Sequence, residues 1–279
     1  MNTPRSILSR GSSSSHFKLA RELLKRQLRP ILKPRRFQAY CLGTAKSGTH
    51  SIAEIFNPNY RALHEPESEE LIAKILAAQN SQQSKSALLE YVKRRDRNMR
   101  LELDSSQLNY FFLDSLVSEF PNAKFILTIR DCYSWLDSFI NHQLSRNCSP
   151  NWQRLRDFRF DSNSEYKEEE KILAQHGLYT LDGYLSYWAE HNREVLTTVP
   201  KEKLLVVRTH EIPQEIEKIA DFLSISLDNL NLSKAHSFKA KKHFNILSEI
   251  DKQFIDNKVN LHCKSLMDEF FPEFMQCRE

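Results

Sequence analysis

A lysine, two glycines and several hydroxyl side chains are concentrated in the segment Gly43 to Ser51 (GTAKSGTHS). Glycine allows the backbone to approach a ligand closely, and backbone N–H groups at the start of a helix form a cradle for an anion. Lys46 adds a positive charge to this segment. The segment therefore predicts a phosphate or sulfate site, and the residues expected to contact the anion are Lys46, Ser47, Gly48, Thr49, His50 and Ser51.

This loop differs from the Walker A loop of ATP- and GTP-binding enzymes, which reads GxxxxGK[ST]. Gly43 and Gly48 have the Walker A separation, but Thr49-His50 stands where Lys-Ser/Thr would be. The lysine lies inside the loop instead. The pattern therefore disfavours a P-loop kinase or NTPase, which stays an alternative, together with a non-catalytic nucleotide-binding protein.

A second pair of polar residues follows the clearest predicted strand, Lys124 to Ile129 (KFILTI). Arg130 comes directly after this strand, and Ser138 lies eight residues later on a predicted helix. An arginine at a strand end makes charge-assisted hydrogen bonds to a phosphate, and a serine two helical turns along adds a hydroxyl. The two segments together predict one nucleotide with an anionic group at each end.

These segments resemble the sulfotransferases that use 3′-phosphoadenosine 5′-phosphosulfate (PAPS) and release 3′-phosphoadenosine 5′-phosphate (PAP). The family's 5′-phosphosulfate loop reads K/R-S/A-G-T-T, which Lys46 to His50 (KSGTH) match except at the last residue. Arg130-Asp131-Cys132 resembles the family's R-D-P, with cysteine in place of proline. The resemblance covers roughly residues 38–225. It implies a P-loop-like sulfotransferase fold, PAPS as donor, PAP as product and no metal.

Two later segments are also similar to landmarks of this family. Gly177-Leu178-Tyr179 precedes a predicted long helix, and the resemblance places Tyr179 at the nucleotide. A further landmark is LLVVRTHEI. The basic run of Lys239, Lys241 and Lys242 either closes over the nucleotide, as in many relatives, or is a solvated surface run.

Sulfonate transfer is assisted by a base that takes the proton of the acceptor. Glu65 lies 19 residues after Lys46, similar to the distance of the catalytic glutamate in several sulfotransferases, and is the first candidate. His64 is the second. Asp104 ends a predicted strand, is expected to face the same cleft, and is the third. Alternatively, Glu65 and Asp104 only stabilise the starts of the helices that follow them. Lys46 is expected to neutralise the charge that develops on the bridging oxygen.

The acceptor is expected to be a small molecule that offers a hydroxyl group or an amino or carbamoyl nitrogen. The chain is similar to small bacterial sulfotransferases, including cyanobacterial enzymes that modify guanidinium alkaloids of the saxitoxin type, which implies secondary metabolism. An acidic set would suit such a cationic acceptor: Glu65, Glu67, Glu69, Glu70 and Asp104. O-sulfation of a carbohydrate or lipid is the alternative.

The elements that must position these residues alternate between strands and helices. Strands are expected over residues 37–43, 99–103, 124–129 and 203–207, and helices over 49–56, 67–78, 84–97, 108–120, 133–144, 179–199, 213–223 and 263–270. This alternation predicts a doubly wound α/β fold with a mostly parallel sheet, whose ligands bind at the carboxyl ends of the strands. Residues 146–166 lack periodicity and are expected to form a long loop, a candidate lid.

The composition predicts a basic amphipathic segment over residues 1–36 and a single sulfotransferase domain over 37–279. The basic segment is expected to pack on the domain. The alternatives are contact with a membrane surface, contact with an acidic substrate and a transit peptide. A net charge of +4 suits an anionic ligand without indicating a nucleic-acid partner. No apolar run reaches the roughly 20 residues of a transmembrane helix. The five scattered cysteines indicate a reducing, cytoplasmic location.

Overall fold

Five short parallel strands form the sheet at the centre of the molecule. The computed structural model describes residues 34–57, 59–234 and 243–276, so most of the basic N-terminal segment and the Lys239, Lys241 and Lys242 run lie outside the described residues. The strands are, in sheet order, β2 (Ala62–His64), β3 (Leu103–Ser105), β1 (Ala39–Cys41), β4 (Lys124–Ile129) and β5 (Leu204–Arg208). Each pairs in parallel with its neighbours, which confirms the expected α/β fold.

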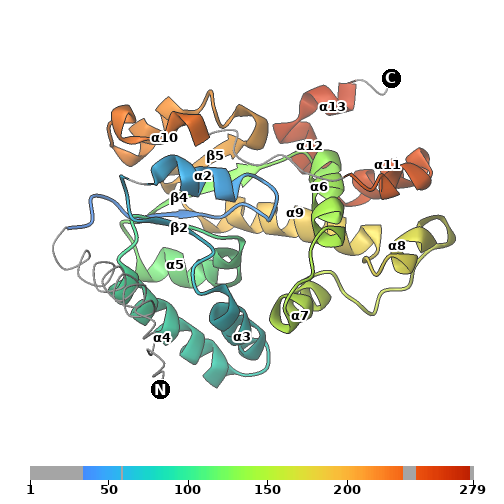
Figure 1. The fold of residues 1–279 in the computed structure, drawn as a ribbon, viewed down its shortest axis with the longest axis horizontal. Coiled ribbons are helices and arrows are strands. Elements are labelled where there is room, and N and C mark those ends of the chain that lie inside the picture. Colours follow the sequence, from blue (N-terminus) through green and yellow to red (C-terminus); the bar gives the residue numbers. More distant parts are fainter. Residues whose placement is uncertain (1–33, 58, 235–242, 277–279) are drawn as a thin grey trace, which may run out of the picture.

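Helices cover both faces of this sheet (Figure 1). One face carries α2 (Thr49–Phe56) and α10 (Ile216–Leu223), and the other carries α3 (Ser68–Ala78), α4 (Gln82–Met99) and α5 (Leu113–Glu119). Ala39 and Cys41 pack toward the first pair, whereas Tyr40 and Leu42 pack toward the second set. Strands buried on both faces read as continuous apolar runs, which is why β1 and β4 were recognisable in the sequence.

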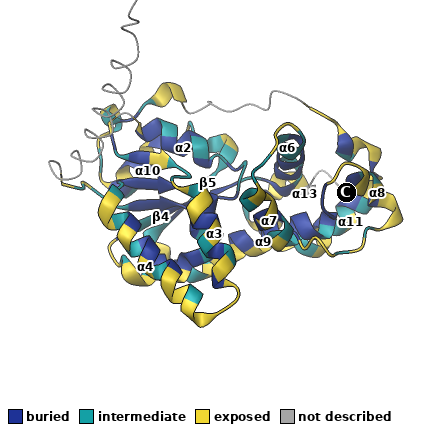
Figure 2. Ribbon diagram, turned by 60° about the horizontal axis from the view of Figure 1, so that its bottom comes forward, coloured by how far each residue is buried: buried dark blue, intermediate teal, exposed yellow. Residues whose placement is uncertain are grey.

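A third group of helices lies beyond the end of β4 (Figure 1). It comprises α6 (Cys132–Leu144), α7 (Pro150–Arg159), α8 (Lys171–Gln175), α11 (Lys252–His262), α12 (Lys264–Phe270) and α13 (Pro272–Gln276). The long helix α9 (Leu181–Thr198) runs from the sheet into this group, and its Trp188 packs in one core with Trp135 of α6. In Figure 2 strand β4 is almost entirely buried, while the surrounding helices alternate between buried and exposed sides.

Short 3₁₀ turns connect these elements. They are η1 (Gln107–Phe112), η2 (Glu168–Glu170), η3 (Lys201–Lys203), η4 (Thr209–Glu211), η5 (Leu227–Asn229), η6 (Leu232–Lys234) and η7 (Ile246–Glu249). The single helix expected over residues 108–120 is in fact η1 followed by α5. The strand expected over 99–103 is present but lies later in the chain, because α4 continues to Met99 and β3 begins at Leu103.

The long loop expected over residues 146–166 is also wrong, because α7 occupies its centre. The side chain of Ser149 accepts a hydrogen bond from the backbone N–H of Trp152, and Pro150 fills the first helical position. Serine at the N-cap and proline directly after it are a recognised helix start. The signal was present in the sequence, but the polar remainder of the helix concealed its period.

The described end of the basic N-terminal segment is attached to the domain by ion pairs. Arg35 lies 2.7 Å from Asp96 on α4, and Arg36 lies 2.8 Å from the buried Glu102. These contacts place residues 34–36 along the edge of the sheet domain. Among the described helices, none combines the length and the apolar character needed to cross a membrane.

Candidate active site

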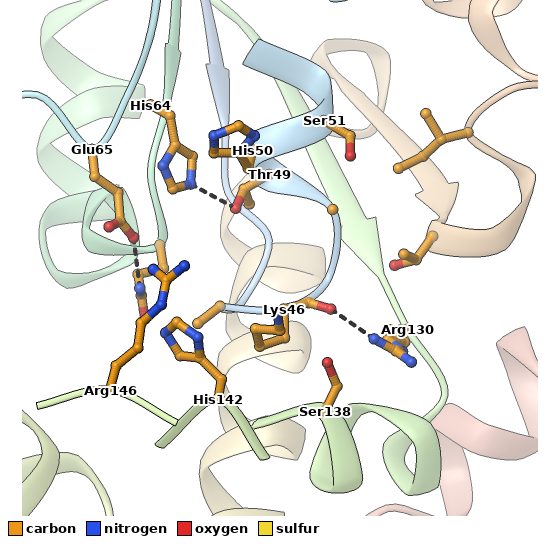
Figure 3. Close-up of a pocket in the computed structure, with 15 residues that line it drawn as sticks. Lys46, Thr49, His50, Ser51, His64, Glu65, Arg130, Ser138, His142 and Arg146 are labelled. Carbon is orange, nitrogen blue, oxygen red and sulfur yellow. Dashed lines mark hydrogen bonds between the residues drawn. The ribbon is translucent and has the colours of Figure 1, made fainter. Parts of the chain in front are cut away.

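A cavity of about 420 Å³ opens at the carboxyl ends of β1, β2 and β4 (Figure 3). Nine residues predicted from the sequence line it: Lys46, Gly48, Thr49, His50, Ser51, His64, Glu65, Arg130 and Ser138. The other lining residues are Ala45, Gln107, His142, Arg146, Thr209 and Ile212, which the sequence analysis did not assign to the site. Lys46 lies between Arg130 and Ser138 at one end and Glu65 at the other (Figure 3).

The loop between β1 and α2 forms the wall of this cavity around Lys46. Lys46 and Gly48 both have positive φ angles, of 68° and 101°. The φ of Gly48 favours glycine, and a Cβ at this position would also require the end of the Ile212 side chain, 2.6 Å away, to shift. The first N–H groups of an α-helix have no partner within the helix, and no acidic residue lies in the first turn of α2. These are the features expected of an anion-binding loop.

Gly43 allows the same loop to pass directly against β4. A Cβ at this position would lie 2.0 Å from the side-chain oxygen of Thr128. Ser47, which was expected to offer a hydroxyl to the anion, does not line the cavity. Its hydroxyl donates instead to the carbonyl of Thr44, at 2.7 Å, and lies 3.1 Å from Thr128 Oγ1. Ser47 is fully buried, and its side chain anchors the loop.

Two residues from distant elements hold the carbonyl groups of this loop. The indole N–H of Trp135 donates to the carbonyl of Ala45, at 2.8 Å. The hydroxyl of Thr209 lies 2.6 Å from the carbonyl of Ser47. Because these two carbonyl groups are hydrogen-bonded to Trp135 and Thr209, the N–H groups of the loop can face the cavity. Sequence spacing gave no sign of the role of Trp135, and Thr209 was noted only as part of a family landmark.

Arg130 lies directly beside the loop, as the two-ended nucleotide site requires. Its Nη1 donates to the carbonyl of Lys46 at 3.3 Å, and its Nε donates to Ser134 Oγ at 2.8 Å. The side chain of Asp131 caps α6 by accepting the N–H of Ser134, at 2.9 Å. Ser138 follows one turn later and lines the cavity. The two predicted anion sites therefore form one continuous site.

The electrostatics of this end favour a bound anion. Burial lowers the pKa of Lys46, and the neighbouring Arg130 and Arg146 lower it further. Burial likewise lowers the pKa of Arg130, against the opposite influence of Asp131. Positive groups brought together in a half-buried site repel one another, so a ligand with several negative charges relieves that repulsion.

Glu65 lies at the opposite end of the cavity, on the segment that follows β2. Its backbone N–H donates to the carbonyl of Ser105, at 3.0 Å, and its φ of 47° is unusual for a residue other than glycine. The side-chain amide of Gln107 donates to Glu65 Oε1, at 2.6 Å. Burial raises the pKa of the Glu65 carboxyl group, and the hydrogen bond from Gln107 opposes that rise. A carboxylate with a raised pKa is suited to accept a proton.

Two histidines that line the cavity, His64 and His142, have lowered pKa values and are therefore neutral near pH 7. Burial, reinforced by His50, lowers the pKa of His64 to about 4. Burial also lowers the pKa of His142 to about 4, with Lys46 as the next cause. His64 Nε2 lies 3.1 Å from the hydroxyl of Thr49 on α2 (Figure 3), so the second candidate base is tied to the anion loop.

The structure does not bring Asp104 to the cavity, and the expectation that it faces the cleft is wrong. Its carboxylate accepts a hydrogen bond from Arg95 of α4 at 2.6 Å, and both side chains are 5% exposed. Successive side chains of a strand point to opposite faces, and the next residue, Ser105, is the one that contacts α2 through the carbonyl of Thr49. Asp104 therefore stabilises the opposite helical layer.

Tyr179, which the family resemblance placed at the nucleotide, lies in a hydrophobic core instead. Its hydroxyl donates to Asp157 at 2.6 Å and accepts from Gln153 at 2.8 Å. Its ring packs on Phe160 with 5.2 Å between the ring centres. Tyr179 joins α7 to the start of α9 and does not line the cavity.

The acidic set that suggested a cationic acceptor is mostly engaged elsewhere. Glu67 accepts a hydrogen bond from Tyr91 at 2.7 Å, and Glu69 accepts one from Ser149, also at 2.7 Å. Glu70 lies on the surface of α3 near Lys74. Glu65 is the member of this set that lines the cavity. Within the described ranges, no group of three or more His, Cys, Asp or Glu side chains is arranged to hold a metal ion.

Comparison with known families gives one extended match. Residues 38–229 match a family model described as a sulfotransferase domain. This region is more than half of the chain, and every residue that lines the cavity lies within it. A curated relative, Ava biosynthesis cluster protein M of Aspergillus versicolor, is 30% identical over 103 residues. That alignment covers 34% of this chain and 40% of the relative, so the chain matches less than half of the relative's length.

Solved structures with partial similarity are a sulfotransferase from Alicyclobacillus acidocaldarius and two sulfotransferase domains of biosynthetic enzymes. The first is 15% identical with a TM-score of 0.42, and the match covers 83% of this chain and 96% of that chain. The domain from the curacin pathway is 15% identical with a TM-score of 0.40, and the match covers 79% of this chain and 89% of that domain. The domain from the Synechococcus PCC 7002 olefin synthase is 16% identical with a TM-score of 0.37, and the match covers 78% of this chain and 82% of that domain.

Proposed function

Since this chain belongs to the sulfotransferase domain family, we propose that it transfers the sulfonate group of PAPS to a nucleophile on a small-molecule acceptor. The observation that carries the proposal is the contact between Arg130 and the carbonyl of Lys46, which joins two anion sites in one cavity. A nucleotide with a 5′-phosphosulfate and a 3′-phosphate has an anion for each site. An ATP-dependent reaction is disfavoured because Thr49-His50 replaces the Lys-Ser/Thr of a Walker A loop.

The donor would be held by residues of two strand ends. The N–H groups at the start of α2, with Lys46 and the hydroxyls of Thr49 and Ser51, would bind the 5′-phosphosulfate. Arg130 and Ser138 would bind the 3′-phosphate. The crowding of positive charge at Lys46 and Arg130 supports this assignment, because the ligand would supply the missing negative charge.

The reaction we propose is an in-line displacement at sulfur. The acceptor nucleophile forms a bond to sulfur while the bond between sulfur and the 5′-phosphate oxygen breaks. The electron pair of that bond stays on the phosphate oxygen, where Lys46 neutralises the developing charge. Glu65 takes the proton of the acceptor, and PAP leaves as the second product.

We favour a hydroxyl group on a polar acceptor, such as a carbohydrate or another hydroxylated metabolite. The acceptor end is lined by Glu65, the neutral His64 and His142, and Arg146 (Figure 3). Neutral imidazoles and an arginine offer hydrogen bonds to hydroxyl groups. A guanidinium alkaloid of the saxitoxin type is the second candidate, and it would rest on the carboxylate of Glu65.

Nucleotide binding followed by transfer would test this function. Calorimetric titration should give much tighter binding of PAP than of ATP with Mg²⁺, because the loop lacks the Walker A lysine and hydroxyl. Transfer of labelled sulfonate from PAPS should then be measured with panels of sugars, phenols, amines and guanidinium compounds. Preferential binding of ATP with Mg²⁺ would reassign the protein to the nucleotide hydrolases or kinases. PAP binding without transfer across the panel would indicate a non-catalytic nucleotide-binding protein.

A further inference from the structure

A chain of hydrogen bonds links Glu65 to helix α7, which the mechanism above does not use. The amide nitrogen of Gln107 donates to Glu65 Oε1 at 2.6 Å. The amide oxygen of the same side chain accepts from Arg159 Nη1, also at 2.6 Å. Both polar groups of Gln107 are thus engaged, and Gln107 itself is only 5% exposed.

The contact with Arg159 fixes which way the Gln107 amide points. A side-chain amide has one donor end and one acceptor end, and a guanidinium group can only donate. Arg159 therefore holds the oxygen of Gln107 on its own side and leaves the nitrogen facing Glu65. The ionised carboxylate of Glu65, which only accepts, selects the same orientation, so without Arg159 the amide oxygen loses its donor and the amide is held by the carboxylate alone.

Arg159 is itself held in place by aromatic rings. Its guanidinium carbon lies 4.8 Å from the ring centre of Phe160, 5.2 Å from Tyr187 and 5.6 Å from Phe139. The hydroxyl of Tyr187 lies 3.2 Å from Nδ1 of the buried His191. These three rings restrict the position of the guanidinium, and a cation is favoured near their faces. This packing makes the direction of the Gln107 amide a fixed property of the fold.

The same arrangement acts on the backbone of Glu65. Its N–H donates to the carbonyl of Ser105, two residues before Gln107, so the two segments are joined by main chain and by side chain. The left-handed conformation of Glu65, with φ of 47°, persists because these contacts determine it. One carboxylate oxygen is engaged by Gln107, which leaves the other for the acceptor.

We propose that Arg159 and Gln107 are positioning residues that orient Glu65 and keep its carboxylate ionised for proton transfer. The role as base rests on the proposed function, whereas the control of ionisation is a property of the protein alone. Burial raises the pKa of Glu65, and the hydrogen bond from Gln107 and the charge of Arg159 oppose that rise. The other titratable or charged groups that line the same cavity are Lys46, His50, His64, Arg130, His142 and Arg146.

The variant that tests this inference is Arg159→Met, which keeps a long side chain against the aromatic rings and removes the donor. The ionisation of Glu65 is followed by carboxyl infrared or ¹³C NMR titration, with Glu65→Gln identifying the signal. We expect the pKa of Glu65 to rise in Arg159→Met and in Gln107→Leu, and to return toward the wild-type value in Arg159→Lys. An unchanged pKa in Arg159→Met would overturn the inference, whether or not the protein transfers sulfonate.

Kinetics with PAPS and an accepted substrate provide the second measurement. We expect kcat to fall about tenfold in Arg159→Met. The acid limb of the kcat/KM profile should move to higher pH than in the wild type, and the affinity for PAP should not change. Arg156→Met is the matched control, because Arg156 is buried one turn earlier on α7 and contacts Cys148. A fall in kcat of the same size in the control, without movement of the acid limb in Arg159→Met, would show that α7 acts only as a structural support.

Discussion

The two ends of the cavity are built in different ways. The end around Lys46 and Arg130 consists of backbone groups and of residues that directly follow β1 and β4. The end around Glu65 depends on Gln107 after β3 and on Arg159 of α7. Gln107 donates to Glu65 at 2.6 Å and accepts from Arg159 at 2.6 Å. The groups expected to contact the ligand at the first end thus come from short continuous segments, although Trp135 and Thr209 anchor the loop from distant elements. At the second end, the groups that contact Glu65 come from residues far apart in the chain.

This difference implies different roles for the two ends: the Lys46 end binds the donor and stabilises its leaving group, and the Glu65 end accepts the proton of the acceptor. A glycine-containing loop at a helix start binds an anion by its geometry, with little dependence on surrounding side chains. A carboxylate acting as a base needs a particular ionisation and direction, and other side chains must supply both. Substitutions at the Lys46 end should therefore change donor binding and sulfonate release, and those at the Glu65 end should change proton transfer alone.

The largest expected effect is at Lys46. Lys46→Ala should lower turnover about 1000-fold, because the charge that develops on the leaving phosphate oxygen loses its nearest cation. PAP affinity should fall far less, since the N–H groups of α2 and Arg130 remain. Single-turnover transfer and calorimetric titration of PAP would measure the two quantities. Lys201→Met, an exposed lysine in η3 before β5, serves as control. Normal turnover in Lys46→Ala would remove its assigned role.

Glu65→Gln should have the second largest effect on turnover, and it tests whether the Glu65 end acts in proton transfer without contributing to donor binding. Turnover should fall about 100-fold through loss of the base, while PAP binding stays unchanged. The wild-type rate should rise with pH through the raised pKa of Glu65 and then level off, because only the ionised form accepts a proton. His64 and His142, each with a pKa of about 4, contribute no further limb near neutral pH.

Glu67→Gln is the matched control for the base. Glu67 also has a positive φ, of 55°, but its carboxylate binds Tyr91 and does not line the cavity. The pH profile of the Glu67→Gln variant should keep the acid limb that is lost in the Glu65→Gln variant. If the limb survives in Glu65→Gln and disappears in His64→Gln, the base is the histidine.

Much of the Lys46 end could be predicted from the sequence because its signals are local. Short segments indicated both a strand or helix and the residues expected to bind the ligand: the apolar run before Gly43, the glycines, and the strand before Arg130. The family assignment based on them is confirmed. Ser47 was misjudged because its hydroxyl points toward Thr128, and sequence spacing does not determine the direction of a side chain in a loop.

The Glu65 end could be predicted only in part. Glu65 itself was found by its distance from Lys46, but β2 is three residues long and gave no strand signal. Gln107 and Arg159 were missed because their roles depend on contacts between residues 52 positions apart. Asp104 was misassigned because the face of a strand cannot be decided over three residues.

Arg130→Ala should have a smaller effect that is confined to the nucleotide. We expect PAP affinity to fall about 30-fold, the range of a lost charge-assisted hydrogen bond, while AMP, which lacks the 3′-phosphate, is bound almost as before. The preference for PAP over AMP, measured by titration, should largely disappear. Arg208→Ala is the control, because Arg208 ends the neighbouring strand β5 and pairs with Glu211. Equal losses for PAP and AMP would place the 3′-phosphate elsewhere.

Asp104→Asn should have the smallest effect on turnover and tests the boundary between the cavity and the layer behind it. The substitution removes the negative charge opposite the buried Arg95, and leaving one charge of such a pair uncompensated costs about 3 kcal/mol of stability. The midpoint of urea unfolding should therefore fall, while turnover per folded molecule and the acid limb of the pH profile should not change. A loss of turnover comparable to that of Glu65→Gln would mean that Asp104 reaches the acceptor after all, and the separation between the two ends would need to be redrawn.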